Sequence, residues 1–206
     1  MRSIRRNVFE TNSSSTHSLS LNYGEVSEDL ELTLPINRSS EVKKFNIIKY
    51  PIVQEGYAFS EIEKLRIIVA LITEFAADEY TAKIKEEWKV KNNLSRFDWS
   101  YGYNDFYQKK VRLKGAKTFM YEHRFWKYLN AVLKKRLNIH ILLPETNDYF
   151  PFISDFIDDG LGAETRGYYR ELGWSFKTTR EEFMKQVDDI IFNPEISFWQ
   201  ETWYNH

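Results

Sequence analysis

The spacing of hydrophobic residues in the first quarter of the chain predicts β-strands. Residues 18–23 (SLSLNY) alternate apolar with small polar side chains, as a half-buried strand does. The same alternation occurs in residues 29–35 (DLELTLP), which end at a proline, and more weakly in residues 43–52. Residues 4–10 (IRRNVFE) are a further strand candidate. The N-terminal region is therefore predicted to consist mostly of strands and turns.

From residue 60 onwards the hydrophobic spacing becomes that of helices. Ser60 and Glu63 form a capping box, which predicts a helix that begins here and runs as far as Trp88. A second helix is predicted over residues 118–136. Its hydrophobic stripe ends in three basic residues, which suit the negative end of a helix dipole.

The rest of the chain adds two strands and a third helix. Residues 138–144 (NIHILLP) predict a short strand. The third helix is predicted to begin at Thr178 or Thr179, each followed by a glutamate three residues later, and to end at Asn193 before a proline. Residues 196–204 (ISFWQETWY) predict a closing strand.

This order of elements predicts an α+β fold in a single domain over residues 1–206. The N-terminal strands are expected to form a mostly antiparallel sheet that packs against three main amphipathic helices, with a closing C-terminal strand. The core is expected to include Leu19, Leu21, Leu65, Ile68, Ile72, Leu129, Val132, Val187 and Ile190.

Composition narrows the classes of partner and compartment. The 29 basic and 30 acidic residues nearly cancel, so no strong overall field favours nucleic acid as the partner. The chain has no cysteine, which excludes disulfides and thiolate metal sites. Its longest apolar run, residues 67–72, is too short to span a membrane, and no signal peptide is visible. These features predict a cytoplasmic protein without a membrane partner.

Residues 11–18 (TNSSSTHS) are eight consecutive small polar residues, predicted to form a loop between the strands at 4–10 and 18–23. Hydroxyls, turn amides and a histidine are groups that bind a phosphate or stabilise a developing oxyanion. The alternative is a structural turn, because serine, threonine and asparagine commonly bond their own backbone. His17 is the candidate catalytic acid or base. The candidate ligand-binding residues are Asn12, Ser13, Ser14, Ser15, Thr16, Ser18, Arg5 and Arg6.

Aromatic residues are concentrated in a second stretch, residues 96–117, where basic residues follow them. Such residues stack on nucleic-acid bases, form the energetic centres of protein interfaces, or pack a core beneath a loop. The balanced net charge makes nucleic acid the less favoured of the two partners. The candidate partner surface consists of Trp99, Tyr101, Tyr103 and Trp203.

The remaining polar clusters carry weaker signals. Three aspartates at 155, 158 and 159 are read as a solvated turn, so no metal site is predicted. His123 is expected at a surface or boundary position of the second helix. His140, in the strand at 138–144, approaches the octet at 11–18 only if those strands share a sheet. No hydrolase, nucleotide-loop or dinucleotide motif is present, and the sequence indicates no particular cofactor.

The stretch RRNVFETNSSSTHSL, residues 5–19, resembles the opening of a family of small, largely uncharacterised proteins from phages and prophages of Gram-positive bacteria. These proteins begin with a basic-Asn-x-Phe-Glu-Thr-Asn-Ser-Ser-Ser-x-His-Ser signature. SDFIDDGL (residues 154–161) and DDIIFNPEISFW (residues 188–199) resemble two further landmarks of the family. The resemblance implies a phage-type accessory protein that acts in the cytoplasm of a bacterial host cell.

Two functions are consistent with these features. In the first, the octet binds a phosphorylated ligand, a nucleotide or phosphoester, with or without catalysis. In the second, the protein is a non-catalytic effector or inhibitor that docks through an aromatic surface on a host or phage protein, for example a component of a defence system. The sequence leaves open whether the protein is an enzyme.

Overall fold

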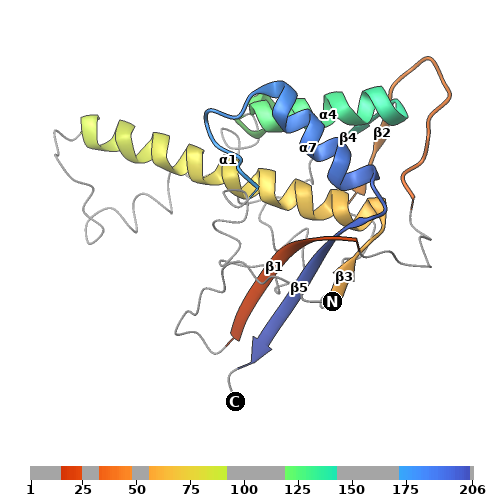
Figure 1. The fold of residues 1–206 in the computed structure, drawn as a ribbon. Helices are drawn as coiled ribbons and strands as arrows, with labels where there is room; N and C mark the ends of the chain where they lie inside the picture. The colour runs from red at the N-terminus through yellow and green to blue at the C-terminus, as the bar shows by residue number, and fades with distance from the viewer. Residues whose placement is uncertain (1–14, 25–32, 48–55, 92–118, 143–171, 205–206) are drawn as a thin grey trace.

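The computed structural model describes residues 15–24, 33–47, 56–91, 119–142 and 172–204 (Figure 1). Helices and strands are both present, which confirms the α+β class. The elements in chain order are β1 (Ser15–Tyr23), β2 (Lys43–Phe45), β3 (Gly56–Ala58), α1 (Glu61–Lys91), α4 (Arg124–Leu137), β4 (Ile139–Ile141), α7 (Arg180–Phe192) and β5 (Ile196–Tyr204).

The strands form two small sheets. The first is antiparallel with the order β1-β5-β3, so the last strand of the chain lies in its centre rather than at an edge. β1 pairs with β5 over nine residues, from Ser15 opposite Tyr204 to Tyr23 opposite Ile196. The second sheet is the parallel pair β2-β4. Long-range pairing thus joins the two ends of the described chain.

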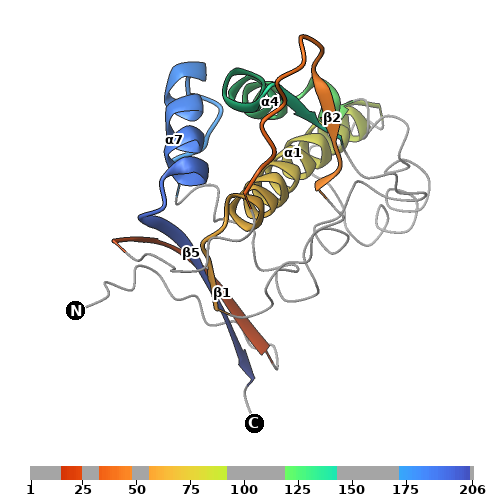
Figure 2. The same cartoon turned by 90° about the vertical axis from the view of Figure 1, so that its right-hand side faces the viewer.

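Helix α1 lies between the three-stranded sheet and the helices α4 and α7. Figures 1 and 2 show the β1-β5-β3 sheet on one side of α1, with α4 and α7 on the other. Ten consecutive residues of this helix, 64–73, are buried. This part of α1 is therefore buried all round, as a helix covered on several sides is.

The buried apolar residues of the described chain form one cluster. Seven of the nine expected core residues belong to it, while Leu21 packs against it partly buried. The side chain of Leu19 lies outside the described part. The buried expected residues are Leu65, Ile68, Ile72, Leu129, Val132, Val187 and Ile190.

Two helix starts confirm the capping boxes expected from the sequence. The Glu63 amide donates to Ser60 Oγ at 3.2 Å, and the Ser60 amide donates to Glu63 Oε2 at 3.1 Å. Thr179 and Glu182 make the same reciprocal bonds at the start of α7. Local hydrogen bonding between residues three apart fixes these starts, which is why the sequence predicts them.

Other element boundaries differ from the expectation. The second helix begins at Arg124 rather than at residue 118, because His123 is extended and caps it, while residues 119–122 form a separate helical turn. Residues 33–35 are not in a strand, and the remainder of the strand expected at 29–35 lies outside the described residues. The strand expected at 4–10 lies outside them as well.

Candidate functional site

The second half of the polar octet is a strand and not a loop. Ser15, Thr16, His17 and Ser18 begin β1 and pair with residues 204 to 201 of β5. The expected loop over 11–18 is therefore wrong for these four residues. The sequence did not predict this part of the strand, because residues 15–18 lack the alternating hydrophobic residues by which a strand is usually recognised. Threonine itself favours strands.

The strand geometry divides the octet between two faces of the sheet. Alternate residues of a strand lie on opposite faces, so Ser15 and His17 share the face that carries Leu21. Thr16 and Ser18 fall on the opposite face. The four described positions of the octet therefore alternate between the two faces of the sheet.

His140 does not share a sheet with the octet. It lies in β4, opposite Lys44 of β2, in the two-stranded sheet. Burial, together with the charges of Lys44 and Lys134, lowers the pKa of His140 below its ordinary value. Its neutral form is favoured, and the condition under which it would approach the octet is not met.

Most of the other expected site residues lie outside the described part of the chain. These are Arg5, Arg6, Asn12, Ser13, Ser14, Trp99, Tyr101 and Tyr103. The backbone of Trp203 is described, in β5 opposite Thr16, but its side chain is not. The expected exposure of the aromatic surface stays a prediction.

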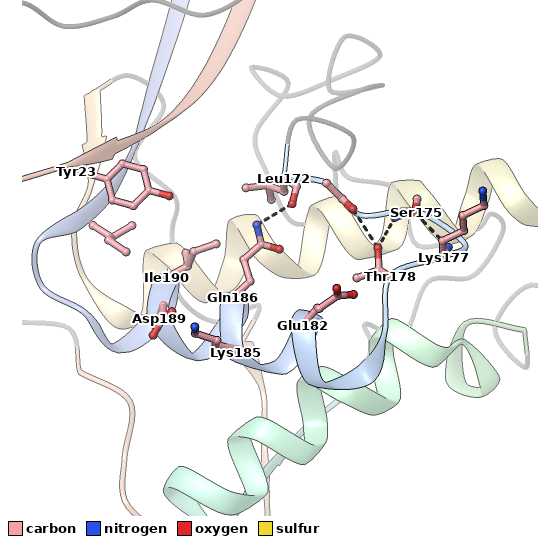
Figure 3. A pocket seen from close by; sticks show the side chains of 12 residues that line it. Tyr23, Leu172, Ser175, Lys177, Thr178, Glu182, Lys185, Gln186, Asp189 and Ile190 are labelled. Atoms are coloured by element: carbon pink, nitrogen blue, oxygen red, sulfur yellow. Dashed lines mark hydrogen bonds between the residues drawn. The ribbon is translucent and has the colours of Figure 1, made fainter.

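The described residues form a surface groove that was not expected from the sequence. It has a volume of about 550 Å³ and runs between the end of β1, helix α7 and the turn at residues 172–178. Figure 3 shows Tyr23 at one end and Lys177 at the other. We call it the Tyr23 groove. Its wall near Tyr23 is apolar and includes Leu172, Ile190 and Ile196.

The turn that forms the polar end of the Tyr23 groove is held by its own hydrogen bonds. Thr178 Oγ1 accepts from the Ser175 amide at 2.7 Å and donates to the Gly173 carbonyl at 3.0 Å. Ser175 Oγ accepts from the Lys177 amide at 3.2 Å. Gly173 has a φ of 76°, a left-handed conformation that favours glycine. These hydroxyls therefore shape the turn and have little capacity left for a ligand.

Helix α7 contributes the floor of the Tyr23 groove. Gln186 Nε2 donates to the Leu172 carbonyl at 2.7 Å, and its amide oxygen accepts from Trp174 Nε1, which ties the turn to the helix. The bonds from Thr179 lower the pKa of the Glu182 carboxyl. Gln186 and Glu182 therefore support the local structure.

Four groups on the rim of the Tyr23 groove are open to a partner. The ring of Tyr23 is 71% exposed. Lys177, Lys185 and Asp189 are exposed, and their side chains form no ion pair or hydrogen bond with another described residue. The groove thus combines an aromatic anchor and an apolar wall with free charges of both signs.

Lys64 is a buried cation in the core of the molecule. Lys64 is only 1% exposed. Its Nζ donates to the carbonyls of Asn193 at 2.9 Å and Ile196 at 3.1 Å. Burial lowers the pKa of Lys64 to about 8, although Glu61 raises it in part. The lysine joins the start of α1 to the turn between α7 and β5. It borders a small cavity of about 240 Å³, but its bonds give it a structural role.

A second polar group lies among aromatic rings where α1 meets α4. His123 Nδ1 accepts from the Phe125 amide at 3.3 Å, which places the proton of the neutral ring on Nε2. Nε2 lies 3.4 Å from Glu79 Oε2, a close contact without good hydrogen-bond alignment. Glu79 also contacts Arg124 at 3.6 Å. The surface or boundary position expected for His123 is wrong, because the residue is 5% exposed.

Neither a metal site nor a membrane span is found in the described parts. No group of three or more histidine, aspartate or glutamate side chains there is arranged to hold a metal ion. None of the helices in those parts combines the length and the apolar character needed to cross a bilayer.

The comparisons with other proteins supply no relative. No family model matches the chain, and no curated protein or solved structure shows significant similarity to it.

Proposed function

We propose that this protein is a non-catalytic binding protein that docks on another protein through the Tyr23 groove. The exposed ring of Tyr23, above an apolar wall that includes Ile190 and Ile196, is the observation that carries the proposal. Tyrosine is enriched at the energetic centres of interfaces, because it offers a large apolar ring with few rotatable bonds and a hydroxyl that can reach a polar partner.

The state of the reactive side chains supports binding rather than catalysis. Lys64 uses two donors on backbone carbonyls, and His123 uses the lone pair of Nδ1 on a helix amide. A catalytic acid, base or nucleophile needs a free lone pair or proton within reach of a substrate. These two buried groups are committed to the fold.

The groove also indicates the chemistry of its partner. An apolar or aromatic side chain fits against Tyr23 and Ile190, and an acidic side chain next to it meets Lys185, which is exposed. An extended protein segment with these two features is the proposed occupant. Because residues 5–19 resemble the opening of phage and prophage proteins, we propose that this segment belongs to a host or phage protein.

The first test uses peptides of defined sequence, selected from a random displayed library on the immobilised wild-type protein. Tyr23→Ala is expected to weaken the affinity of the selected peptides by about 30-fold or more, as the loss of an interface hot spot does. Because Tyr23 is 71% exposed, the substitution should leave the fold intact. Isothermal titration calorimetry measures both affinities.

Ile36→Ala is the matched control, because Ile36 is 68% exposed and does not line the groove. It should leave the affinity unchanged. Peptides that bind Tyr23→Ala as tightly as the wild type, or that lose affinity equally with Ile36→Ala, would show that docking occurs elsewhere.

A phosphorylated ligand is the second candidate function. It is supported by the placement of Ser15 and His17 on one face of β1, two residues apart, where a hydroxyl and a titratable ring could meet the same phosphate. Whether such a site would be catalytic is left open by this arrangement.

This second candidate predicts a thermal shift with a panel of nucleotides and nucleotide analogues. A ligand at one hundred times its dissociation constant adds about 2.7 kcal/mol to the free energy of unfolding. Ser15→Ala and His17→Ala should abolish the shift, whereas Ser18→Ala, on the opposite face, should keep it. If no phosphorylated compound stabilises the wild type, or if Ser18→Ala abolishes the shift equally, this function is rejected.

A further inference from the structure

Helix α7 presents two rows of residues to the Tyr23 groove. Residues four apart on a helix lie in one row, about 6 Å apart along the axis. The floor row consists of Glu182, Gln186 and Ile190, and the rim row consists of Lys185 and Asp189. Burial increases along the floor row, from the exposed Glu182 to Ile190, which is 1% exposed. The groove is therefore most apolar at the end near Tyr23 (Figure 3).

The rim row carries two charges of opposite sign. Lys185 and Asp189 are both exposed, and neither side chain forms an ion pair or hydrogen bond with another described residue. The adjacent Asp188, by contrast, accepts a hydrogen bond from Arg136 Nε at 2.7 Å, so its charge is used in the contact between α7 and α4. A lysine that precedes an acidic residue is also the less favourable order for pairing within a helix. Because both rim residues are exposed, each can reach an occupant of the groove.

An extended protein segment matches the spacing of both rows. In such a segment adjacent side chains point to opposite sides, and the side chains on one side repeat about every 6.7 Å. This repeat is close to the spacing of about 6 Å within each row of α7. A segment that lies along the helix therefore directs alternate side chains to the floor row and to the rim row.

We propose that the Tyr23 groove binds an extended segment in which a hydrophobic residue is followed, in the direction away from Tyr23, by a basic residue, any residue and an acidic residue. The hydrophobic side chain packs on Tyr23 and Ile190, and the basic side chain pairs with Asp189. The third side chain faces Gln186, whose amide is bonded within the protein, and the acidic side chain pairs with Lys185. This order rests on the proposed docking function, to which it adds the basic residue and the spacing.

The two kinds of contact are expected to contribute differently to binding. The hydrophobic side chain is enclosed between an aromatic ring and a buried wall, so it supplies most of the affinity. An exposed ion pair adds little affinity, whereas two like charges placed opposite each other repel. The rim row therefore selects among segments that carry the same hydrophobic residue, by rejecting those with the wrong order of charges.

Reversal of one rim charge at a time tests this order, with peptides selected on the wild-type protein. Lys185→Glu should weaken their binding about tenfold, and replacement of the acidic residue of the peptide by lysine should restore it. Asp189→Lys should weaken binding similarly and should be rescued by glutamate in place of the basic residue. Lys83→Glu, at an exposed position of α1 outside the groove, is the control and should leave the affinity unchanged. Isothermal titration calorimetry measures each affinity, and circular dichroism checks each fold.

The spacing is tested by one inserted residue between the basic and the acidic residue of a selected peptide. The insertion turns the acidic side chain from the rim row to the floor row, so binding should weaken. Unchanged affinity would overturn the extended geometry. Selected peptides without the two charges at this spacing, or rescue of Lys185→Glu by a change at the basic position, would overturn the order of charges.

The outcomes separate this order from the docking function on which it rests. Binding that is lost with Tyr23→Ala, but does not respond to either charge reversal, would reject the order of charges and retain docking in the groove. Peptides that bind Tyr23→Ala as tightly as the wild type, or a library that yields no binder, would reject the docking function and the order of charges together.

Discussion

Lys64→Met is expected to lower the free energy of unfolding by about 2 kcal/mol at pH 7, and by considerably more at pH 10. Methionine fills the volume of the lysine but cannot donate to the carbonyls of Asn193 and Ile196. The Asn193 carbonyl keeps the Ile196 amide as a donor at 3.2 Å, whereas the Ile196 carbonyl loses its bond to the lysine. A buried carbonyl left without a donor costs about 1–3 kcal/mol. Part of this loss is offset at pH 7, because methionine removes the cost of burying a charge.

The pH dependence follows from the lowered pKa of Lys64. Burial lowers this pKa to about 8 from 10.5. Between these values the unfolded chain binds the proton and the folded chain does not, so the free energy of unfolding of the wild type rises with pH. The full rise is on the order of 3 kcal/mol. The neutral amine still has two N–H donors for its two carbonyls, so the bonds survive deprotonation.

Urea denaturation of the wild type and Lys64→Met at pH 7 and pH 10 measures this difference. Groups that titrate alike in both proteins cancel in the comparison. Lys83→Met, at an exposed position of α1, is the matched control for loss of a lysine. A stability difference that narrows as the pH rises would mean that the ammonium form is favoured in the fold, contrary to the structure.

Because Lys64 bonds to Ile196, which lines the Tyr23 groove, peptide binding should weaken in this variant too.

Signals confined to a few neighbouring residues predicted the fold best. The capping boxes at Ser60 and Thr179 gave the starts of α1 and α7, since each bond joins residues three apart. β5 matches the expected range of 196–204, because Pro194 follows the helix before it and the segment is rich in the aromatic and β-branched residues that favour strands. Such signals depend on local hydrogen bonding and periodicity, which a sequence displays directly.

Features that depend on distant contacts were not visible in the sequence. The elements that cover α1 on several sides come from other parts of the chain, and the sequence of α1 does not identify them. The strand start at Ser15 depends on pairing with Tyr204, at the far end of the described chain. The β2-β4 pair likewise joins residues about one hundred positions apart.

The candidate site was harder to predict than the fold. The Tyr23 groove is built from the end of β1, the turn at 172–178 and α7, which are far apart in sequence. The only local signals were a tyrosine at the end of a strand, before Gly24, and a Gly-x-Ser-x-x-Thr spacing from Gly173 to Thr178. The composition of the polar octet suggested a loop, yet its residues 15–18 form the start of a strand through pairing with β5.

His123→Ala is expected to lower the free energy of unfolding by about 3 kcal/mol, because it removes a helix cap and a buried ring together. Loss of an N-cap costs about 1 kcal/mol. The ring packs edge-on against Phe75 and Phe125, with centroids 5.7 Å and 5.5 Å away, so its removal leaves a cavity. Glu79 also loses its contact with Nε2 and keeps only the longer one to Arg124.

His123→Asn separates the cap from the contact with Glu79. Asparagine is among the best N-cap residues, so it should restore the bond to the Phe125 amide while its short side chain fails to reach Glu79. The expected loss is about half that of His123→Ala, measured by urea denaturation at pH 7. Glu79→Gln in both backgrounds completes a double-mutant cycle for the ion contact. If asparagine proves as destabilising as alanine, the ring packing and the Glu79 contact, rather than the cap, are what hold the start of α4.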